Sequence, residues 1–375
     1  MRSPAPGRFP ILLACVALLC GADRALGQGR MLEPLEAFFG PASAVFSSDG
    51  RTLFVSNSAR ADYGMVAGRG AISRVSVAED GTLKVTEPRL VDGLNAPIGV
   101  TLMPVAVGDF PAGTLVAAVG GRWTMKDRTT RVTDPRERET GLIFFDPVTG
   151  ARRGAVYLGS GSALDAAIGH GMADPSHVVF DGAGNCFVAD VAGLGLQKEP
   201  GDTSQPGIIR LTPAALGALA RGETPAAGSI EFQSVPEVAG GIAWYEKERL
   251  FYWATGPGFG DLAGAVLRLR GGDFGPGGKI ETVHKEIFPM IGACVTANGS
   301  LIVAHTDGAI GVIKRGRGKV KPVKFRAREV FISPGQPAAT TLGDGRVLVV
   351  VPEMASGGRP AWRHRLQMFT LPSDY

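Results

Sequence analysis

Charged residues are scarce in this 375-residue chain, and long apolar runs are confined to its beginning. Charged residues make up 20% of the chain and the formal net charge is +4, a balance too mild to indicate nucleic-acid binding. Beyond the first 27 residues no run approaches the roughly 20 apolar residues of a membrane-spanning helix. Hydrophobic residues nevertheless reach 45%, enough to bury a core and to argue against disorder.

The first residues have the pattern of a secretory signal peptide, which we predict to span residues 1–27. Two arginines precede an apolar stretch at 9–21, and Ala25 and Gly27 are the small residues before the cut. We therefore expect an exported protein, either periplasmic or extracellular. A lipid anchor on Cys20 is the alternative, but the Ala-Leu-Leu before it lacks the small neighbour that such a site requires.

Cysteine is the other scarce residue, because only Cys186 and Cys294 remain after this cleavage. Two cysteines do not make a disulfide framework. Both lie in apolar, strand-like runs, so we expect buried free thiols.

Glycine and proline are abundant, with 54 and 26 copies, and they punctuate a repeat. The repeated phrase is an apolar strand, a turn and a second apolar strand that ends in a small or polar residue. Asp-Gly and Asn-Gly in its turns supply the positive φ that tight hairpins need. The six copies span 43–58, 98–121, 177–193, 241–256, 292–308 and 338–353.

Each of the first five copies is followed by two further strand-like runs, and the sixth by one. Six four-stranded units at this spacing predict an all-β fold, a six-bladed β-propeller over residues 28–375. We expect residues 31–39 to complete the last blade as its outer strand, because an open ring would expose two sheet edges. A short helix is predicted after Thr212 and Pro213.

In a propeller the starts of the innermost strands and the ends of the second strands open on one face, here called the strand-start face. Loops on such a rigid scaffold often carry function. The ordinary alternative is that each polar residue there is satisfied by backbone or water. No catalytic residue is assigned, and the candidate binding residues are Asn57, Asn95, Arg122, Trp123, His177, Asp190, His305, Asp307 and Glu353.

Three polar segments have alternative interpretations. The insertion 121–140 is either a solvated loop or a lid whose Arg122 and Trp123 contact a ligand. His170, Asp174 and His177 suggest a metal, but their spacing fits no common zinc pattern. The basic run 314–328 is either the solvated outer edge of the fifth blade, which we favour, or a surface that binds an anionic partner.

Three phrases resemble the blades of a known family: GGIAWYEKERLFYWATG, GACVTANGSLIVAHTDGAIGVIKR and DPSHVVFDGAGNCFVAD. That family contains senescence marker protein, gluconolactonase and the luciferin-regenerating enzyme, and the resemblance implies a six-bladed propeller. The family's lactonases hold calcium or zinc in the channel through a carboxylate of the first blade and Asn and Asp of later blades. The metal polarises the lactone carbonyl and an Asp acts as the base.

The chain departs from this pattern at the metal-ligand positions. Residues 39–43 contain no carboxylate, the expected Asn falls on Gly240, and the acidic residue at the end of that blade's second strand falls near Thr255. The expected Asp falls on Ile291. We therefore expect no metal and no other cofactor.

Two functions remain open at this point. The first is a monomeric binding propeller that takes a small molecule or a protein partner, but no nucleic acid, on its channel face. The alternative is a metal-dependent lactone or ester hydrolase with rearranged calcium or zinc ligands, drawn from Asn95, Asp190, Asp307 and Glu353.

Overall fold

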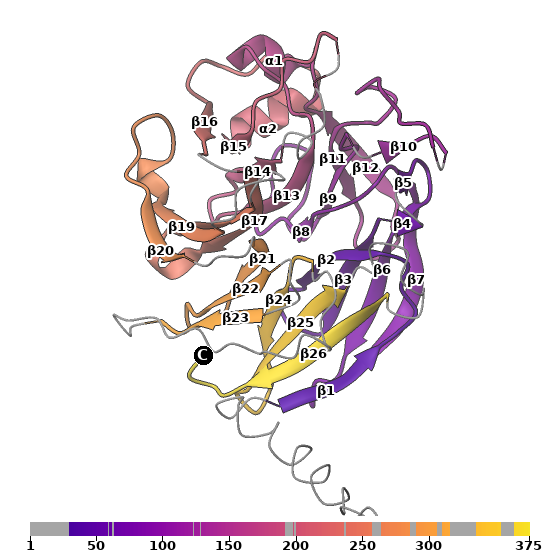
Figure 1. Cartoon of the computed structure of the whole chain (residues 1–375), viewed down its shortest axis with the longest axis vertical. Helices are drawn as coiled ribbons and strands as arrows, with labels where there is room; N and C mark the ends of the chain where they lie inside the picture. The colour runs from indigo at the N-terminus through magenta and orange to yellow at the C-terminus, as the bar shows by residue number, and fades with distance from the viewer. Residues whose placement is uncertain are drawn as a thin grey trace, which may run out of the picture.

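Six antiparallel sheets surround a central channel as blades, which confirms the predicted all-β, six-bladed β-propeller (Figure 1). Among the residues that the structure describes, no helix is long and apolar enough to cross a membrane. The predicted signal peptide, 1–27, lies outside the described residues. The computed structural model describes residues 30–58, 60–61, 64–122, 124–127, 129–191, 198, 200–235, 238–256, 264–285, 290–305, 310–315, 335–353 and 364–375.

Blades one to four each contain four strands that follow chain order from the channel to the rim. Blade one has β2 (Pro41–Phe46), β3 (Thr52–Asn57), β6 (Gly70–Val77) and β7 (Leu83–Leu94). Blade two has β8 (Val100–Leu102), β9 (Leu115–Val119), β11 (Gly141–Phe145) and β12 (Arg152–Tyr157). Blade three has β13 (Pro175–Phe180), β14 (Cys186–Asp190), β15 (Gly207–Leu211) and β16 (Ile230–Ser234). Blade four has β17 (Val238–Tyr245), β18 (Leu250–Gly256), β19 (Ala265–Arg270) and β20 (Glu281–Lys285).

Blade six closes the ring with the N-terminal strand, as predicted. Its strands are β24 (Ala338–Thr341), β25 (Val347–Glu353), β26 (Arg365–Leu371) and β1 (Arg30–Leu35). β1 pairs antiparallel with β26, so the indigo strand β1 and the yellow strand β26 lie side by side in Figure 1. Blade five shows β21 (Met290–Val295), β22 (Leu301–His305) and β23 (Ile310–Ile313). Its predicted fourth strand falls outside the described residues.

Several short elements join these strands. The predicted helix is α2 (Pro213–Ala220), and the Thr212 side chain caps it by accepting from the backbone N–H of Ala215. Not predicted were the helix α1 (Ala163–Ile168), the 3-10 turns η2 (Glu246–Glu248) and η3 (Gly271–Asp273), and a small sheet of β4 (Arg60–Ala61), β5 (Gly64–Val66) and β10 (Thr124–Met125).

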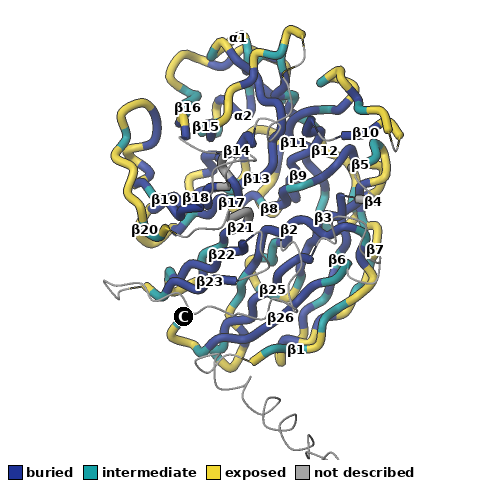
Figure 2. The backbone as a smooth tube through the Cα atoms, in the orientation of Figure 1, coloured by how far each residue is buried: buried dark blue, intermediate teal, exposed yellow. Residues whose placement is uncertain are grey.

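The hydrophobic core is divided into six clusters of described residues, one at each interface between neighbouring blades. Successive residues of a strand point to opposite sheet faces, so each blade supplies two clusters. In β25, Val347 and Val349 pack towards blade five, whereas Leu348 and Val350 pack towards blade one. Figure 2 shows the result, with buried blade interiors and exposed segments concentrated along the outer edges.

Candidate functional site

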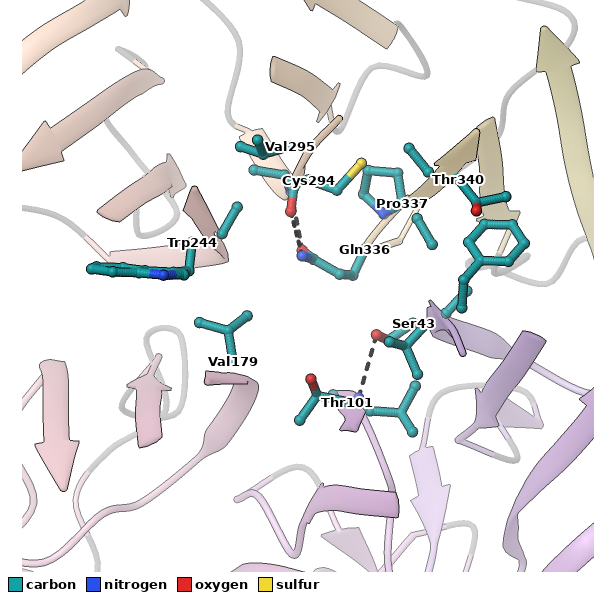
Figure 3. A pocket seen from close by; sticks show the side chains of 18 of the residues that line it. Ser43, Thr101, Val179, Trp244, Cys294, Val295, Gln336, Pro337 and Thr340 are labelled. Atoms are coloured by element: carbon teal, nitrogen blue, oxygen red, sulfur yellow. Dashed lines mark hydrogen bonds between the residues drawn. The ribbon is translucent and has the colours of Figure 1, made fainter. Parts of the chain in front are cut away.

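The six innermost strands, β2, β8, β13, β17, β21 and β24, surround a cavity of about 470 Å³ (Figure 3). That volume lies within the range of small-molecule sites. Each of these strands is the edge of its own sheet, so backbone N–H and C=O groups face the channel. Hydroxyl, thiol and apolar side chains add to the wall, among them Thr101, Val179, Cys294, Val295, Pro337 and Thr340.

The cavity opens where the innermost strands end. On β2, Ser43 is buried and Phe46 is partly exposed, and on β21 the same change separates Ala293 from Val295. In β8, β13, β17 and β24, partly exposed residues also follow buried ones. The mouth therefore lies at the first hairpin turns, beside the exposed Ser48 of the wall, and faces away from the strand-start face.

Glycines close the other end by letting neighbouring backbones touch. A Cβ on Gly99 would lie 2.7 Å from the carbonyl oxygen of Ser176, and one on Gly292 would lie 2.4 Å from that of Gly335. Such distances exclude any side chain, and close backbone approach is a recognised reason for glycine in a strand. Blades two and three, and blades five and six, therefore meet directly at this end.

Gln336 ties its own blade, blade six, to blades one, four and five at the same end. Its backbone N–H donates to the carbonyl of Ala42 at 2.9 Å. Its side-chain oxygen accepts from the N–H of Ala293 at 3.0 Å, and its amide nitrogen donates to the carbonyls of Ile242 (3.1 Å) and Ala293. These bonds satisfy edge groups of blades four and five, so Gln336 acts as a floor to the cavity.

The described cavity wall is almost free of charge. His177 lies on it, and burial lowers the pKa of this imidazole to about 4, so the ring is neutral at pH 7. The wall contains no Lys or Arg among the described residues, and its one carboxylate is Asp49 at the mouth. Hydrogen bonds from the Ser47 hydroxyl and the Arg51 backbone lower the pKa of Asp49, which therefore stays ionised in contact with solvent.

The predicted binding residues at second-strand ends are engaged within their own blades. Asn57 accepts from the N–H of Phe39 (3.3 Å) and donates to the Ser73 hydroxyl (2.9 Å). Asp190 accepts two backbone N–H groups just before β13, at 2.8 and 2.9 Å. Glu353 accepts from Nε of Arg365 at 2.7 Å. These side chains fasten strand ends to preceding loops, and His305, at the end of β22, is also buried.

The two predicted residues that precede or enter the insertion also make internal contacts. Asn95 accepts from the N–H of Gly68 (2.8 Å) and donates to the carbonyl of Glu137 (3.2 Å). Arg122 is 1% exposed and pairs with Asp202. Trp123 and Asp307 lie outside the described residues. Of the seven candidates that the structure describes, His177 is the one that lies on the cavity wall.

The two thiols differ in their surroundings. Cys186 is buried between blades two and three, as expected. Cys294 is free but partly exposed on the cavity wall, which corrects the expectation that both are buried. β21 is the edge strand of its sheet, and its residues change from buried at Ala293 to partly exposed at Cys294 and Val295 as it approaches the channel mouth.

Asp174 is a buried acid beside the strand-start face, and the sequence patterns did not single it out as structural. Asp174 has no exposed surface, and neither of its carboxylate oxygens has a hydrogen-bond partner among the described residues. Burial first, and then the nearby charge of Asp190, raises the pKa of Asp174 to about 8, although Arg138 and Arg122 oppose the shift. The sequence predicted only a polar loop at this position. It could not show that Asp174 is buried, because the nearby Arg122 and Arg138 belong to the separate insertion 121–140.

In the described part of the chain, the arrangement of oxygen donors does not fit the family's channel metal. Asn95, Asp190 and Glu353 are each engaged in separate blades, and no cluster of three or more His, Cys, Asp or Glu side chains suited to a metal occurs in the described ranges. His170 and His177 do not form such a cluster with Asp174 either.

Several solved structures are similar to this chain in fold. No known family profile matches the sequence, and no characterised protein matches it at the sequence level. A gluconolactonase from Xanthomonas campestris is 17% identical, with a TM-score of 0.53 over 95% of this chain and 93% of its own. A putative oxidoreductase (glucose dehydrogenase) from Thermus thermophilus is 17% identical, with a TM-score of 0.56 over 91% and 99%.

An α-L-arabinofuranosidase from Fusarium graminearum is also similar, at 12% identity and a TM-score of 0.53 over 91% of this chain and 98% of its own. These three proteins are named for different reactions, so the shared architecture leaves the reaction open. The resemblance in fold that the blade phrases indicate is confirmed: the chain is a six-bladed β-propeller of the architecture found in gluconolactonases.

Proposed function

We propose that this chain is an exported binding protein whose central cavity takes a small, uncharged molecule without a metal ion. The observation that carries the proposal is the cavity wall, which has one carboxylate at its mouth and a neutral histidine at its inner end. Burying an unpaired charge in such a wall would cost several kcal/mol, whereas an uncharged molecule of matching size loses little.

The hydrogen bonds that the polar residues of the strand-start face already make support the absence of a metal. A calcium site needs several oxygen ligands within about 2.3–2.6 Å of one point. Asn95 and Asp190 hold backbone groups of different loops, and gathering them around an ion would break those bonds. The alternative, hydrolysis by a metal with rearranged ligands, therefore requires that the purified protein contain a bound metal.

Metal content is expected to be negligible in the purified mature protein. Elemental analysis should find far less than one equivalent of calcium or zinc, and the melting temperature should be the same with EDTA as with added CaCl₂. One bound equivalent, together with a melting temperature lowered by chelation, would reverse the proposal and make lactone hydrolysis the activity to assay.

Binding is expected to favour uncharged molecules. In a thermal-shift and calorimetry screen of neutral lactones and their hydrolysed acids, the lactone of a binding pair should bind at least about tenfold more tightly, a difference of about 1.4 kcal/mol. Val179→Trp, which fills the wall, should abolish binding, whereas Val148→Trp on the exposed surface should not. Binding of the acids alone would contradict the proposal.

A further inference from the structure

The two ends of the cavity differ in how their backbone edges are satisfied. At the strand-start end, Gln336 engages edge groups of Ile242 and Ala293, and the Ser43 hydroxyl accepts from the N–H of Val100 at 3.4 Å. Towards the mouth, the same strand edges line open space instead. Hydrogen-bonding capacity is thus used to close one end and remains available at the other.

We propose that the ligand is an uncharged molecule bearing hydroxyl or carbonyl groups, and that it reaches the cavity through the mouth at the first hairpin turns. This inference rests on the proposed binding function. Edge N–H and C=O groups recognise such a molecule because they are donors and acceptors without net charge. Small polar side chains, including Thr101 and Thr340, add hydroxyl groups beside them.

Passage through the opposite end would require the closing contacts to break. Gly241 and Gly292 bring blades four, five and six together so closely that a Cβ on either would lie within 2.6 Å of a neighbouring atom. Gln336, 9% exposed, spans the same three blades. At the mouth, by contrast, Ser48 and Ala297 are exposed turn residues of the wall, so no packed contact has to open there.

The chain contains its own reporter of this route. Cys294 is a partly exposed residue of the cavity wall whose side chain also packs against the cluster between blades five and six, whereas Cys186 is fully buried between blades and serves as an internal control. Burial raises the pKa of the Cys294 thiol, so modification will be slow and relative rates are the useful quantity. In the mature chain, mass spectrometry should find one modified cysteine.

The experiment compares three methanethiosulfonates on the folded mature protein at one pH: the neutral methyl reagent, the anionic sulfonatoethyl reagent and the cationic trimethylammonium-ethyl reagent. In each case the cysteine thiolate attacks the sulfenyl sulfur, the reagent's sulfur–sulfonyl bond breaks, the alkylthio group forms a mixed disulfide with the cysteine, and methanesulfinate leaves. We expect the neutral reagent to modify Cys294 at least about tenfold faster than either charged reagent, after correction for their rates with a free thiol.

Blocking variants then test the route. Ser48→Trp with Ala297→Trp, at the mouth, should slow the neutral reagent at least about tenfold, whereas Gln205→Trp, exposed on the strand-start face, should not. Melting temperatures near that of the parent would show that the variants fold, and Ser48→Trp alone replaces the pair if they do not. Unchanged modification in the mouth variants, no modification of Cys294 in the parent, or equal rates for all three reagents would each overturn the inference.

Failure of the proposed function would look different. If the mouth variants slow modification but no neutral lactone protects Cys294 or raises the melting temperature, the route stands and the binding function falls. If a neutral lactone raises the melting temperature while the mouth variants leave its association rate unchanged, binding stands and the route falls.

Discussion

Gly99→Ala is expected to destabilise the propeller by on the order of 3 kcal/mol, the upper range for overpacked sites. The added methyl would lie 2.7 Å from the Ser176 carbonyl and 2.9 Å from the Cα of His177, both of them backbone atoms. Neither can rotate away, so blades two and three would have to separate at the closed end of the channel. Urea denaturation at pH 7 measures the effect as a lower midpoint with an unchanged slope.

Gly343→Ala is the matched control for this prediction. It makes the same chemical change, but a Cβ on Gly343 has no neighbour within 4 Å and its φ lies outside the left-handed region. Its free energy of unfolding should change by less than about 0.5 kcal/mol. Equal effects at the two positions would show that close contact between blades does not hold the channel end shut.

Asp174→Asn is expected to stabilise the protein at pH 8 and to have little effect near pH 4. The pKa of Asp174 is about 8 in the folded protein against an ordinary 3.8, so the folded state holds a proton that the unfolded chain releases as the pH rises. Stability is therefore lost between pH 4 and pH 8. From pH 5 to pH 8 the loss approaches about 4 kcal/mol for an ideal single group, and Asn, which carries no proton to lose, should remove this slope.

The measurement is the free energy of unfolding against pH for the parent and the variant. His177 acts in the opposite sense: its pKa of about 4 in the folded state, below the ordinary 6.5, costs stability as the pH falls through that interval in both proteins. The difference between parent and variant isolates Asp174. Asp190→Asn, which weakens acceptors for two backbone N–H groups, should destabilise at both pH values. Parallel pH curves for the parent and Asp174→Asn would refute the assignment.

The blade architecture could be predicted because it is written in local patterns. Alternating apolar residues in segments such as 347–351 fix which side chains face each neighbouring blade. Asp-Gly at 49–50 fixes a hairpin, because Asp49 accepts from the N–H of Arg51 at 3.0 Å and Gly50 takes a φ of 69°. The unpaired strand at 31–39 required a partner, and a ring offers one. These are contacts within one repeat, and neighbouring residues determine them.

The surroundings of the candidate site residues could not be predicted from local patterns. Second-strand ends such as Asn57 and Asp190 were predicted to bind ligand because they are polar and share a face. In the structure Asn57 bonds the N–H of Phe39 and the hydroxyl of Ser73, and Asp190 accepts two backbone N–H groups just before β13, partners that the repeat pattern does not describe. Asp174 is buried near Arg122 and Arg138 of the insertion, and Arg122 in turn pairs with Asp202; no spacing rule connects these segments.

The sequence by itself therefore determined the number of blades, the course of the chain through them and the strand that closes the ring, since strand period, turn chemistry and repeat length are local. Only the tertiary structure decided which end of the channel is open. That choice depends on the distance between backbones of different blades, where Gly99, Gly292 and Gln336 close one end. A glycine in the sequence does not show whether it marks a turn or a place where two backbones touch.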